Sequence, residues 1–134
     1  MFFTYALLLC ACYVGIANGA KVWKQENAND QRFLGIAWDA AASVVNQHKK
    51  TGRFMVPKKV LEARSRRGII ESIVLFQEAW CGPQDGNSLD DICESMCPLY
   101  QGGSEAFYEI RYDGNRIRAS KIEDVQRVLK YINV

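Results

Sequence analysis

The sequence predicts an α+β domain with an antiparallel β-sheet, one long helix before the sheet and an additional helix at the C-terminus. An apolar stripe of helical period occurs early in the chain, two hairpin patterns follow it, and a second helical stripe ends the chain. The chain has 134 residues, of which 49% are hydrophobic and 24% charged. This length and composition fit one small folded domain.

Residues 1–19 have the pattern of a secretory signal peptide. An apolar run from Phe2 to Ala17 contains no charged side chain, and it is shorter than the roughly 20 residues that a membrane-spanning helix needs. Small residues end the run and a polar stretch follows, which is the arrangement that precedes signal cleavage. Removing residues 1–19 from the 134-residue chain leaves 115 residues, a single domain over 20–134 that we expect to be extracellular and free of the membrane.

The processed chain begins with a polar segment over residues 20–28, which we expect to be flexible. Asn29 or Asp30 can cap the start of a helix that ends near Asn46. The helix has one apolar stripe, formed by Phe33, Ile36, Ala37, Ala40, Ala41, Val44 and Val45. Its alanines have small side chains, so the helix can lie close against a sheet.

A first hairpin is predicted around Gly68. Residues 54–60 favour a strand, in which Pro57 indicates an edge or a bulge. Residues 69–76 form an apolar, β-branched run that is typical of a second strand. A glycine between the two strands permits the positive φ that a tight hairpin turn requires.

A second hairpin is predicted over residues 107–119, where side chains alternate on both sides of an Asp113–Gly114 turn signal. The next segment, Ser120–Glu123, matches the S-x-x-E capping box that begins many helices. An apolar stripe from Ile122 to Ile132 continues this pattern, so we expect the additional helix to start here.

The segment between the hairpins, residues 81–104, is rich in Gly, Pro, Asp and Ser and predicts a loop with one helical turn over residues 90–96. All cysteines of the processed chain lie in this loop: Cys81, Cys93 and Cys97. In an oxidising compartment, three thiols allow one disulfide and leave one cysteine over.

Charge is unevenly distributed along the chain although the formal net charge is only +2. Residues 49–67 contain eight basic residues and one acidic residue, a net charge of +7, whereas residues 69–110 contain eight acidic residues and no basic one. Adjacent strands can pair these charges within the fold. Alternatively, the basic segment can bind an acidic partner such as a proteoglycan or a protein patch. The weak overall balance argues against nucleic-acid binding.

The sequence offers little material for catalysis. His48, the only histidine, follows the helix in a polar segment where a solvated side chain is the ordinary outcome. No nucleophile with a general base and no cluster of metal ligands can be assembled from the remaining residues. We therefore expect a non-enzymatic protein with no metal and no cofactor.

The order of these elements resembles that of the secretory (type 2) cystatin family, of which the chain would be a degenerate member. The resemblance rests on three features: the helix with its closing Asn46, Gly68 at the place where the family's Gln-x-Val-x-Gly loop ends, and the Asp113–Gly114 turn. It implies an antiparallel sheet wrapped around one long N-terminal helix. It also implies reversible inhibition of papain-like cysteine proteases by a wedge built from the N-terminal segment and two hairpin loops.

The resemblance places a candidate binding site in three segments. They comprise Trp23, Arg64, Ser65, Arg66, Arg67, Gly68, Asp113, Gly114 and Asn115. The family's motifs are largely lost here, since the first loop keeps only its glycine and the second loop has no tryptophan. We therefore expect weak or altered inhibition. The alternative is a non-inhibitory extracellular protein that binds an acidic partner through the basic hairpin 49–67.

The family's first disulfide implies that Cys81 pairs with Cys93, which leaves Cys97 unpaired or as the alternative partner of Cys81. Arg64–Arg67 also matches the Arg-x-Arg-Arg pattern that secretory convertases cleave. The alternative for this segment is a solvated basic turn. Trp23 could anchor in a pocket of a partner.

Overall fold

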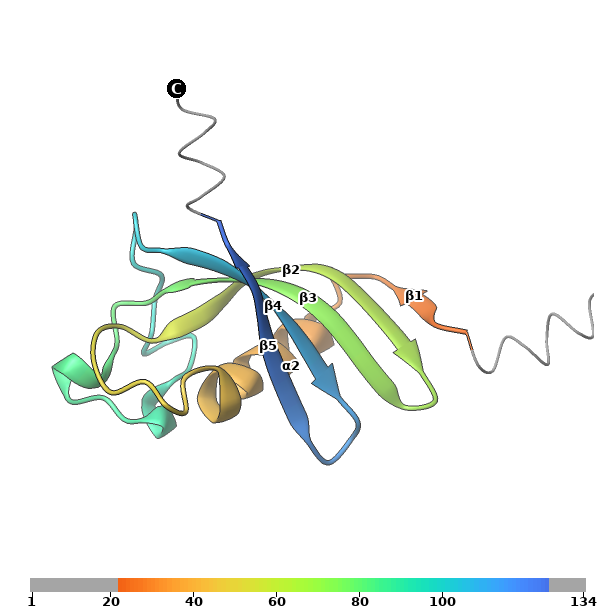
Figure 1. The fold of residues 1–134 in the computed structure, drawn as a ribbon, viewed down its shortest axis with the longest axis horizontal. Helices are drawn as coiled ribbons and strands as arrows, with labels where there is room; N and C mark the ends of the chain where they lie inside the picture. The colour runs from red at the N-terminus through yellow and green to blue at the C-terminus, as the bar shows by residue number, and fades with distance from the viewer. Residues whose placement is uncertain (1–21, 126–134) are drawn as a thin grey trace, which may run out of the picture.

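The computed structural model describes residues 22–125, which form a five-stranded antiparallel sheet with one helix packed on one face (Figure 1). The strands follow the chain order across the sheet. The predicted α+β class with an antiparallel sheet is therefore confirmed. The predicted signal peptide over residues 1–19 lies outside the described residues, as does the predicted helix beyond Val125.

Six regular elements build the domain. They are β1 (Lys24–Glu26), α2 (Gln31–Ala40), β2 (Met55–Arg66), β3 (Ile69–Glu78), β4 (Glu105–Tyr112) and β5 (Ile117–Asp124). A π-helical turn over Ala41–Val45 extends α2, and two short 3-10 turns lie in the loop between β3 and β4. The strands β2, β3, β4 and β5 form two hairpins joined by that loop (Figure 1).

The helix begins and ends where the sequence predicted. Asp30 caps it by accepting a hydrogen bond from the backbone N–H of Arg32 at 2.9 Å. At the other end, Asn46 is buried and donates to the carbonyls of Ala41 (3.0 Å) and Met55 (2.8 Å). Its side-chain oxygen also accepts from the backbone N–H of Met55 at 2.8 Å. Asn46 thus fastens the end of the helix to the start of β2.

Side chains of the sheet alternate between an inner face, which packs on the helix, and an outer face. The inner face and the helix share one core, whose largest fully buried members include Phe33, Phe54, Val74, Phe76 and Ile110. Ala37, Ala40 and Ala41 of the helix are fully buried, which confirms that small side chains let the helix approach the sheet closely. The polar residues of β2 to β5 mostly lie on the outer face.

Both hairpins are present at the predicted turns. The β2–β3 pairing runs from Met55 opposite Glu78 to Arg66 opposite Ile69, and its register shifts between Pro57 and Lys59. Pro57 therefore lies at a bulge, as its missing N–H predicts. The loop between β3 and β4 is irregular apart from its short turns, as its composition indicated.

Two segments differ from their predicted structure. Residues 24–26 form β1 and pair with Ala63–Ser65, so this part of the predicted flexible segment 20–28 is a strand. The segment Ser120–Asp124 belongs to β5 rather than to a helix, because β4 needs a hydrogen-bonding partner along its whole length. The local capping-box pattern is overridden by pairing across the sheet, where Glu123 lies opposite Phe107.

The disulfide joins Cys81 to Cys97, which corrects the favoured pairing of Cys81 with Cys93 and matches the alternative. The backbone explains this choice, since Trp80 donates to the carbonyl of Pro98 at 2.9 Å and so brings the flanking cysteines together. Cys93 is exposed and carries the free thiol. A hydrogen bond with the Ser95 hydroxyl lowers the pKa of this thiol.

Candidate functional site: the hairpin end of the sheet

The turns of the two hairpins lie side by side at one end of the sheet (Figure 1). The register places Ile70 opposite Tyr112, so the β2–β3 and β4–β5 turns begin at nearly the same level. Strand β1 reaches the same end, because Lys24 lies opposite Ser65. We call this region the hairpin end; it comprises Trp23, residues 64–71 and residues 111–118.

The β2–β3 turn has two residues at its tip, Arg67 and Gly68. Both have positive φ, at 50° and 79° respectively. Two consecutive residues in the left-handed region define the tight turn that fits the right-handed twist of a hairpin. Among the described residues other than glycine, only Arg67 adopts a positive φ, so the tip is held in a conformation that few side chains adopt.

The β4–β5 turn is ordered by Asp113. Its Oδ1 atom accepts hydrogen bonds from the backbone N–H groups of Asn115 (3.0 Å) and Arg116 (2.8 Å). These two bonds lower the pKa of the Asp113 carboxyl. The Tyr112 hydroxyl donates to the carbonyl of Gly114 at 3.2 Å, which closes the turn from the other side.

Trp23 is held against the first hairpin by two arginines. The guanidinium carbons of Arg64 and Arg66 lie 4.4 and 4.6 Å from the centre of its ring. At these distances the cations interact with the ring face. The Ser65 hydroxyl also donates to the carboxylate of Glu26 at 2.7 Å. The candidate segment around Trp23 is therefore attached to the hairpin in the described structure.

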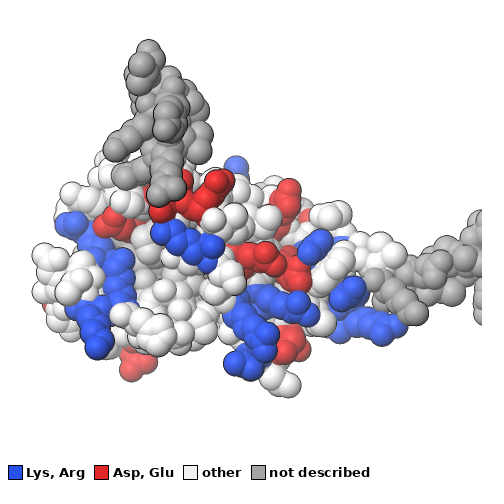
Figure 2. Space-filling view, in the orientation of Figure 1, with Lys and Arg blue, Asp and Glu red and all other residues white. Residues whose placement is uncertain are grey.

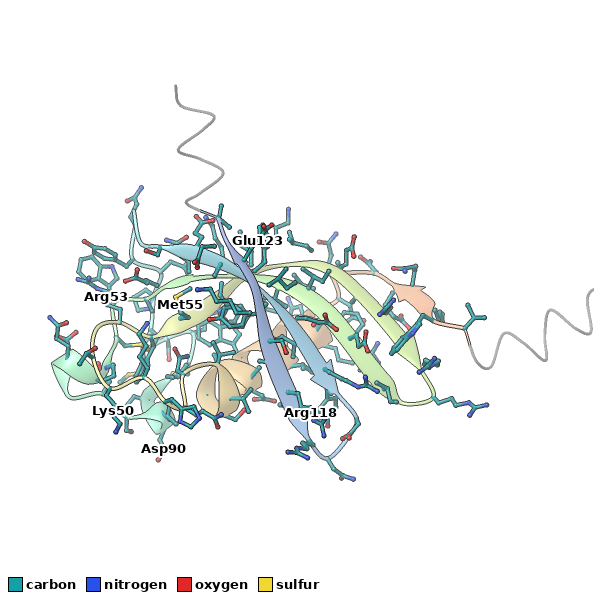
Figure 3. All side chains as sticks on the ribbon, viewed as in Figure 1. Lys50, Arg53, Met55, Asp90, Arg118 and Glu123 are labelled. Atoms are coloured by element: carbon teal, nitrogen blue, oxygen red, sulfur yellow. A yellow bond between two sulfur atoms is a disulfide. The ribbon has the colours of Figure 1, made fainter. Side chains whose placement is uncertain are left out.

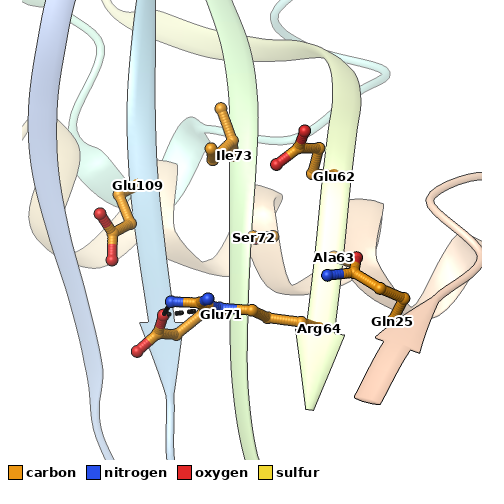
Figure 4. Close-up of a pocket in the computed structure, with 8 residues that line it drawn as sticks. All are labelled: Gln25, Glu62, Ala63, Arg64, Glu71, Ser72, Ile73 and Glu109. Atoms are coloured by element: carbon orange, nitrogen blue, oxygen red, sulfur yellow. Dashed lines mark hydrogen bonds and ion pairs between the residues drawn. The ribbon is translucent and has the colours of Figure 1, made fainter. Parts of the chain in front are cut away.

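A row of charged side chains crosses the outer face of the sheet. Strand register aligns Gln25, Arg64, Glu71, Arg111 and Arg118 on successive strands. Arg64 donates to one Glu71 oxygen at 2.6 and 3.1 Å, and Arg111 lies 3.3 Å from the other oxygen. The Glu71 side chain is only 9% exposed, whereas both arginines are nearly half exposed. One buried carboxylate is thus bracketed by two guanidiniums, and Figure 4 shows its contact with Arg64.

Two shallow hollows flank this row. One, of about 170 Å³, lies towards the middle of the sheet, and its charged lining residues are Glu62, Glu71, Glu109 and Arg64 (Figure 4). The other, of about 230 Å³, lies at the β4–β5 turn and is lined mainly by arginines. At the β4–β5 turn the outer face is mainly basic, whereas over the middle of the sheet acidic side chains lie beside basic ones (Figure 2).

The basic segment 49–67 is not one surface. Strand β2 has 12 residues, which corresponds to a length of roughly 35 Å. Lys50 and Arg53 lie before β2, at the end of the molecule away from the hairpin turns (Figure 3). Some of the basic residues pair with the acidic segment, as Lys58 does with Glu105 at 3.0 Å. The residues predicted for a single patch are thus divided between two ends of the strand.

All candidate residues of the three predicted segments lie at the hairpin end. The sequence-based prediction missed Glu71, Arg111, Arg116 and Arg118. Alternation in the second hairpin indicates that Arg111, Arg116 and Arg118 share one face of that hairpin. Their position beside Arg64 depends on the pairing of β3 with β4, which no local pattern predicts.

Within residues 22–125, no group of three or more His, Cys, Asp and Glu side chains is arranged to hold a metal ion. In the same part of the chain, no helix has the length and apolar character needed to cross a membrane.

No protein-family model matches this chain, and no curated protein matches it significantly. The functional interpretation therefore rests on the geometry and chemistry of the hairpin end.

Proposed function

We propose that the chain is a secreted, non-enzymatic protein of cystatin-like fold that binds papain-like cysteine proteases reversibly through its hairpin end. The observation that carries this proposal is the convergence of Trp23, Arg64–Gly68 and Asp113–Asn115 at one end of the sheet. The five-stranded antiparallel sheet on one helix is compatible with a cystatin-like arrangement. The Cys81–Cys97 disulfide is consistent with an extracellular location.

The shape of the β2–β3 turn supports inhibition rather than cleavage. A protease acts on a peptide that lies extended in its cleft, whereas Arg67 and Gly68 both have positive φ. The strands on both sides of this turn are paired up to Arg66 and Ile69. The turn can therefore occupy a cleft without presenting an extended peptide bond. For the same reason we expect the Arg64–Arg67 motif to resist convertases while the hairpin is folded.

The chemistry of the turns predicts which clefts are suitable. Arg67 is exposed at the tip, and a guanidinium is costly to desolvate unless it meets a carboxylate. A cleft with acidic subsites should therefore bind the hairpin end more tightly than a neutral one. Trp23, clamped between Arg64 and Arg66, supplies an apolar surface next to these charges.

The test is a titration of papain and several cathepsin-type proteases with the protein purified after expression of the full chain. We expect competitive inhibition that is reversed by dilution, with no cleavage of the protein on a denaturing gel. An Arg67→Glu variant should weaken inhibition at least tenfold. A Lys50→Glu variant carries the same charge change at the opposite end of β2, and it should leave inhibition within twofold of the original protein.

Three results would contradict the proposal. One is the absence of inhibition at micromolar concentration for every protease tested. Another is cleavage between Arg67 and Gly68, which would make the protein a substrate. The third is an equal loss of inhibition in the Arg67→Glu and Lys50→Glu variants, because that would indicate an effect of net charge alone.

A further inference from the structure

We propose that the outer face of the sheet at the hairpin end binds a linear sulfated polysaccharide through arginines contributed by both hairpins. The residues are Arg64, Arg66, Arg111, Arg116 and Arg118. This binding surface differs from the basic segment 49–67, since three of its five arginines come from the β4–β5 hairpin. Arg64 and Arg66 also belong to the segment proposed to bind proteases, whereas Arg111, Arg116 and Arg118 do not, so the last three residues distinguish the two proposals.

The first argument is the spacing of the guanidiniums. Arg64, Arg111 and Arg118 stand in one row that crosses β2, β4 and β5. Adjacent strands are about 4.8 Å apart, so the row extends over roughly 14 Å. Arg66 and Arg116 lie two residues further towards the turns, on the same outer face. The cations therefore form an elongated strip across the strands, which fits a linear chain.

The second argument is the excess of positive charge. Two carboxylates lie among these arginines, Glu71 and Asp113. Glu71 is already bracketed by Arg64 and Arg111, and Asp113 is occupied by the backbone N–H groups of its own turn. Even without Arg66, four arginines stand against these two carboxylates, so the strip keeps a net positive charge. Four of its arginines are exposed, with the side chains of Arg64 and Arg111 at 44% and 46%, whereas Arg66 is partly buried and lies over Trp23.

The third argument is the type of cation. All five positions are arginine, whose planar guanidinium can donate two parallel hydrogen bonds to a sulfate group. The hollow at the β4–β5 turn is lined by Ile69, Arg111, Asp113, Arg116 and Arg118, and the Asp113 carboxylate accepts hydrogen bonds from the backbone of its own turn. Three donors surrounding one open hollow of about 230 Å³ can accommodate a sulfated sugar ring.

The surface is less suited to a protein partner. Tight protein interfaces depend on large apolar anchors at their centre. Of the exposed large apolar residues, Trp80, Met96 and Leu99 lie between β3 and β4, Leu61 and Ile122 lie in β2 and β5 away from the turns, and Val22 precedes Trp23 beside the strip. Trp23 lies beside the strip in the segment assigned to protease binding, and Tyr112 hydrogen-bonds within its own turn. The strip itself offers charge and hydrogen-bond donors rather than an apolar centre.

Acidic residues border the arginine strip on the side towards the middle of the sheet. Glu62 and Glu109 line the neighbouring hollow in the middle of the sheet. Their charges repel a polyanion, so the polysaccharide should lie across the strands at the hairpin end and not along them. In Figure 2, basic side chains gather at the hairpin end, next to acidic side chains over the middle of the sheet.

The test measures the affinity of the full-chain expression product for heparin fragments by titration calorimetry at several NaCl concentrations. We compare it with an Arg116→Gln/Arg118→Gln variant, which leaves the Glu71 pairs and the clamp on Trp23 in place. The matched control is Lys49→Gln/Lys50→Gln, which removes the same charge before β2. Unchanged thermal unfolding of both variants shows that the comparison concerns binding.

We expect the arginine variant to bind heparin at least tenfold more weakly, and the lysine variant to bind within twofold of the original protein. Counterion release predicts that losing two contacts lowers the slope of log affinity against log salt by roughly 1.5. No binding at physiological salt, or an equal loss in both variants, would overturn the proposal. Equally tight binding of poly-glutamate or of desulfated heparin would also overturn it.

The two proposals can fail separately. Heparin binding by a protein that inhibits no protease supports the polysaccharide site and rejects the protease site. Protease inhibition without heparin binding supports the protease site and rejects the polysaccharide site. Inorganic sulfate serves as a further probe: if it competes with heparin at equal sulfate concentration, the site binds single ions and the proposed linear site is wrong.

Discussion

The Cys81–Cys97 bridge makes a sharp prediction about stability. Its cysteines are 16 residues apart in the sequence. The chain-entropy model gives about 3 kcal/mol for a loop of this length, because the bridge restricts the unfolded chain. Cys81 and Cys97 are buried, with 5% and 1% of their surface exposed, so alanine is a suitable replacement for both. The double substitution should lower the free energy of unfolding by about 3 kcal/mol. For a domain of this size the midpoint of thermal unfolding should fall by roughly 12–24 °C.

Urea denaturation followed by circular dichroism measures this loss. The control is Cys93→Ser, which changes an exposed free thiol and should alter stability by less than about 0.5 kcal/mol. A thiol reductant should destabilise the original protein as much as the double substitution does, and it should leave the double variant unchanged. If Cys93→Ser destabilises the protein by about 3 kcal/mol while Cys97→Ala has little effect, Cys81 pairs with Cys93 and the structural argument is wrong.

Three further predictions concern single side chains. Asn46→Ala should lower the free energy of unfolding by about 2–4 kcal/mol, because the backbone groups of Met55 lose their buried partner; a loss below about 0.5 kcal/mol in urea would refute this role. Glu71→Gln should lower stability by about 1–2 kcal/mol, less than breaking a fully buried pair, since its arginines are nearly half exposed; an unchanged urea midpoint would show that the pairs contribute nothing. Asp113 has a lowered folded-state pKa, so its contribution to stability is present at neutral pH and is lost as the pH falls below about 4. An NMR titration that placed this pKa at or above its ordinary value of 3.8 would contradict that account.

Sequence patterns correctly predicted the helix cap and the two hairpin turns, which depend on interactions between residues close together in the sequence. Asp30 caps the helix, Gly68 permits the first turn, and Asp113 organises the second turn through bonds to residues within three positions of itself. Each of these effects involves neighbours in the sequence. The position of each turn could therefore be predicted without knowledge of the whole fold.

Elements that depend on distant partners were predicted less well. The capping-box pattern at Ser120 favours a helix, yet this segment completes the pairing with β4. Residues 24–26 are polar, yet they form a strand beside Ala63–Ser65. The choice between Cys93 and Cys97 likewise depends on backbone hydrogen bonds between the segments at 79–80 and 98–99, which bring Cys97 next to Cys81.

The sequence by itself determined the α+β class, the helix and both hairpin turns. These follow from periodicity, capping and turn chemistry, which act over a few residues. Only the tertiary structure decided that the basic segment 49–67 is divided between two ends of β2 and that Arg64 shares a face with Arg111 and Arg118. The physical reason is strand register: hydrogen bonding between strands sets which distant side chains become neighbours, and this pairing is a property of the whole sheet.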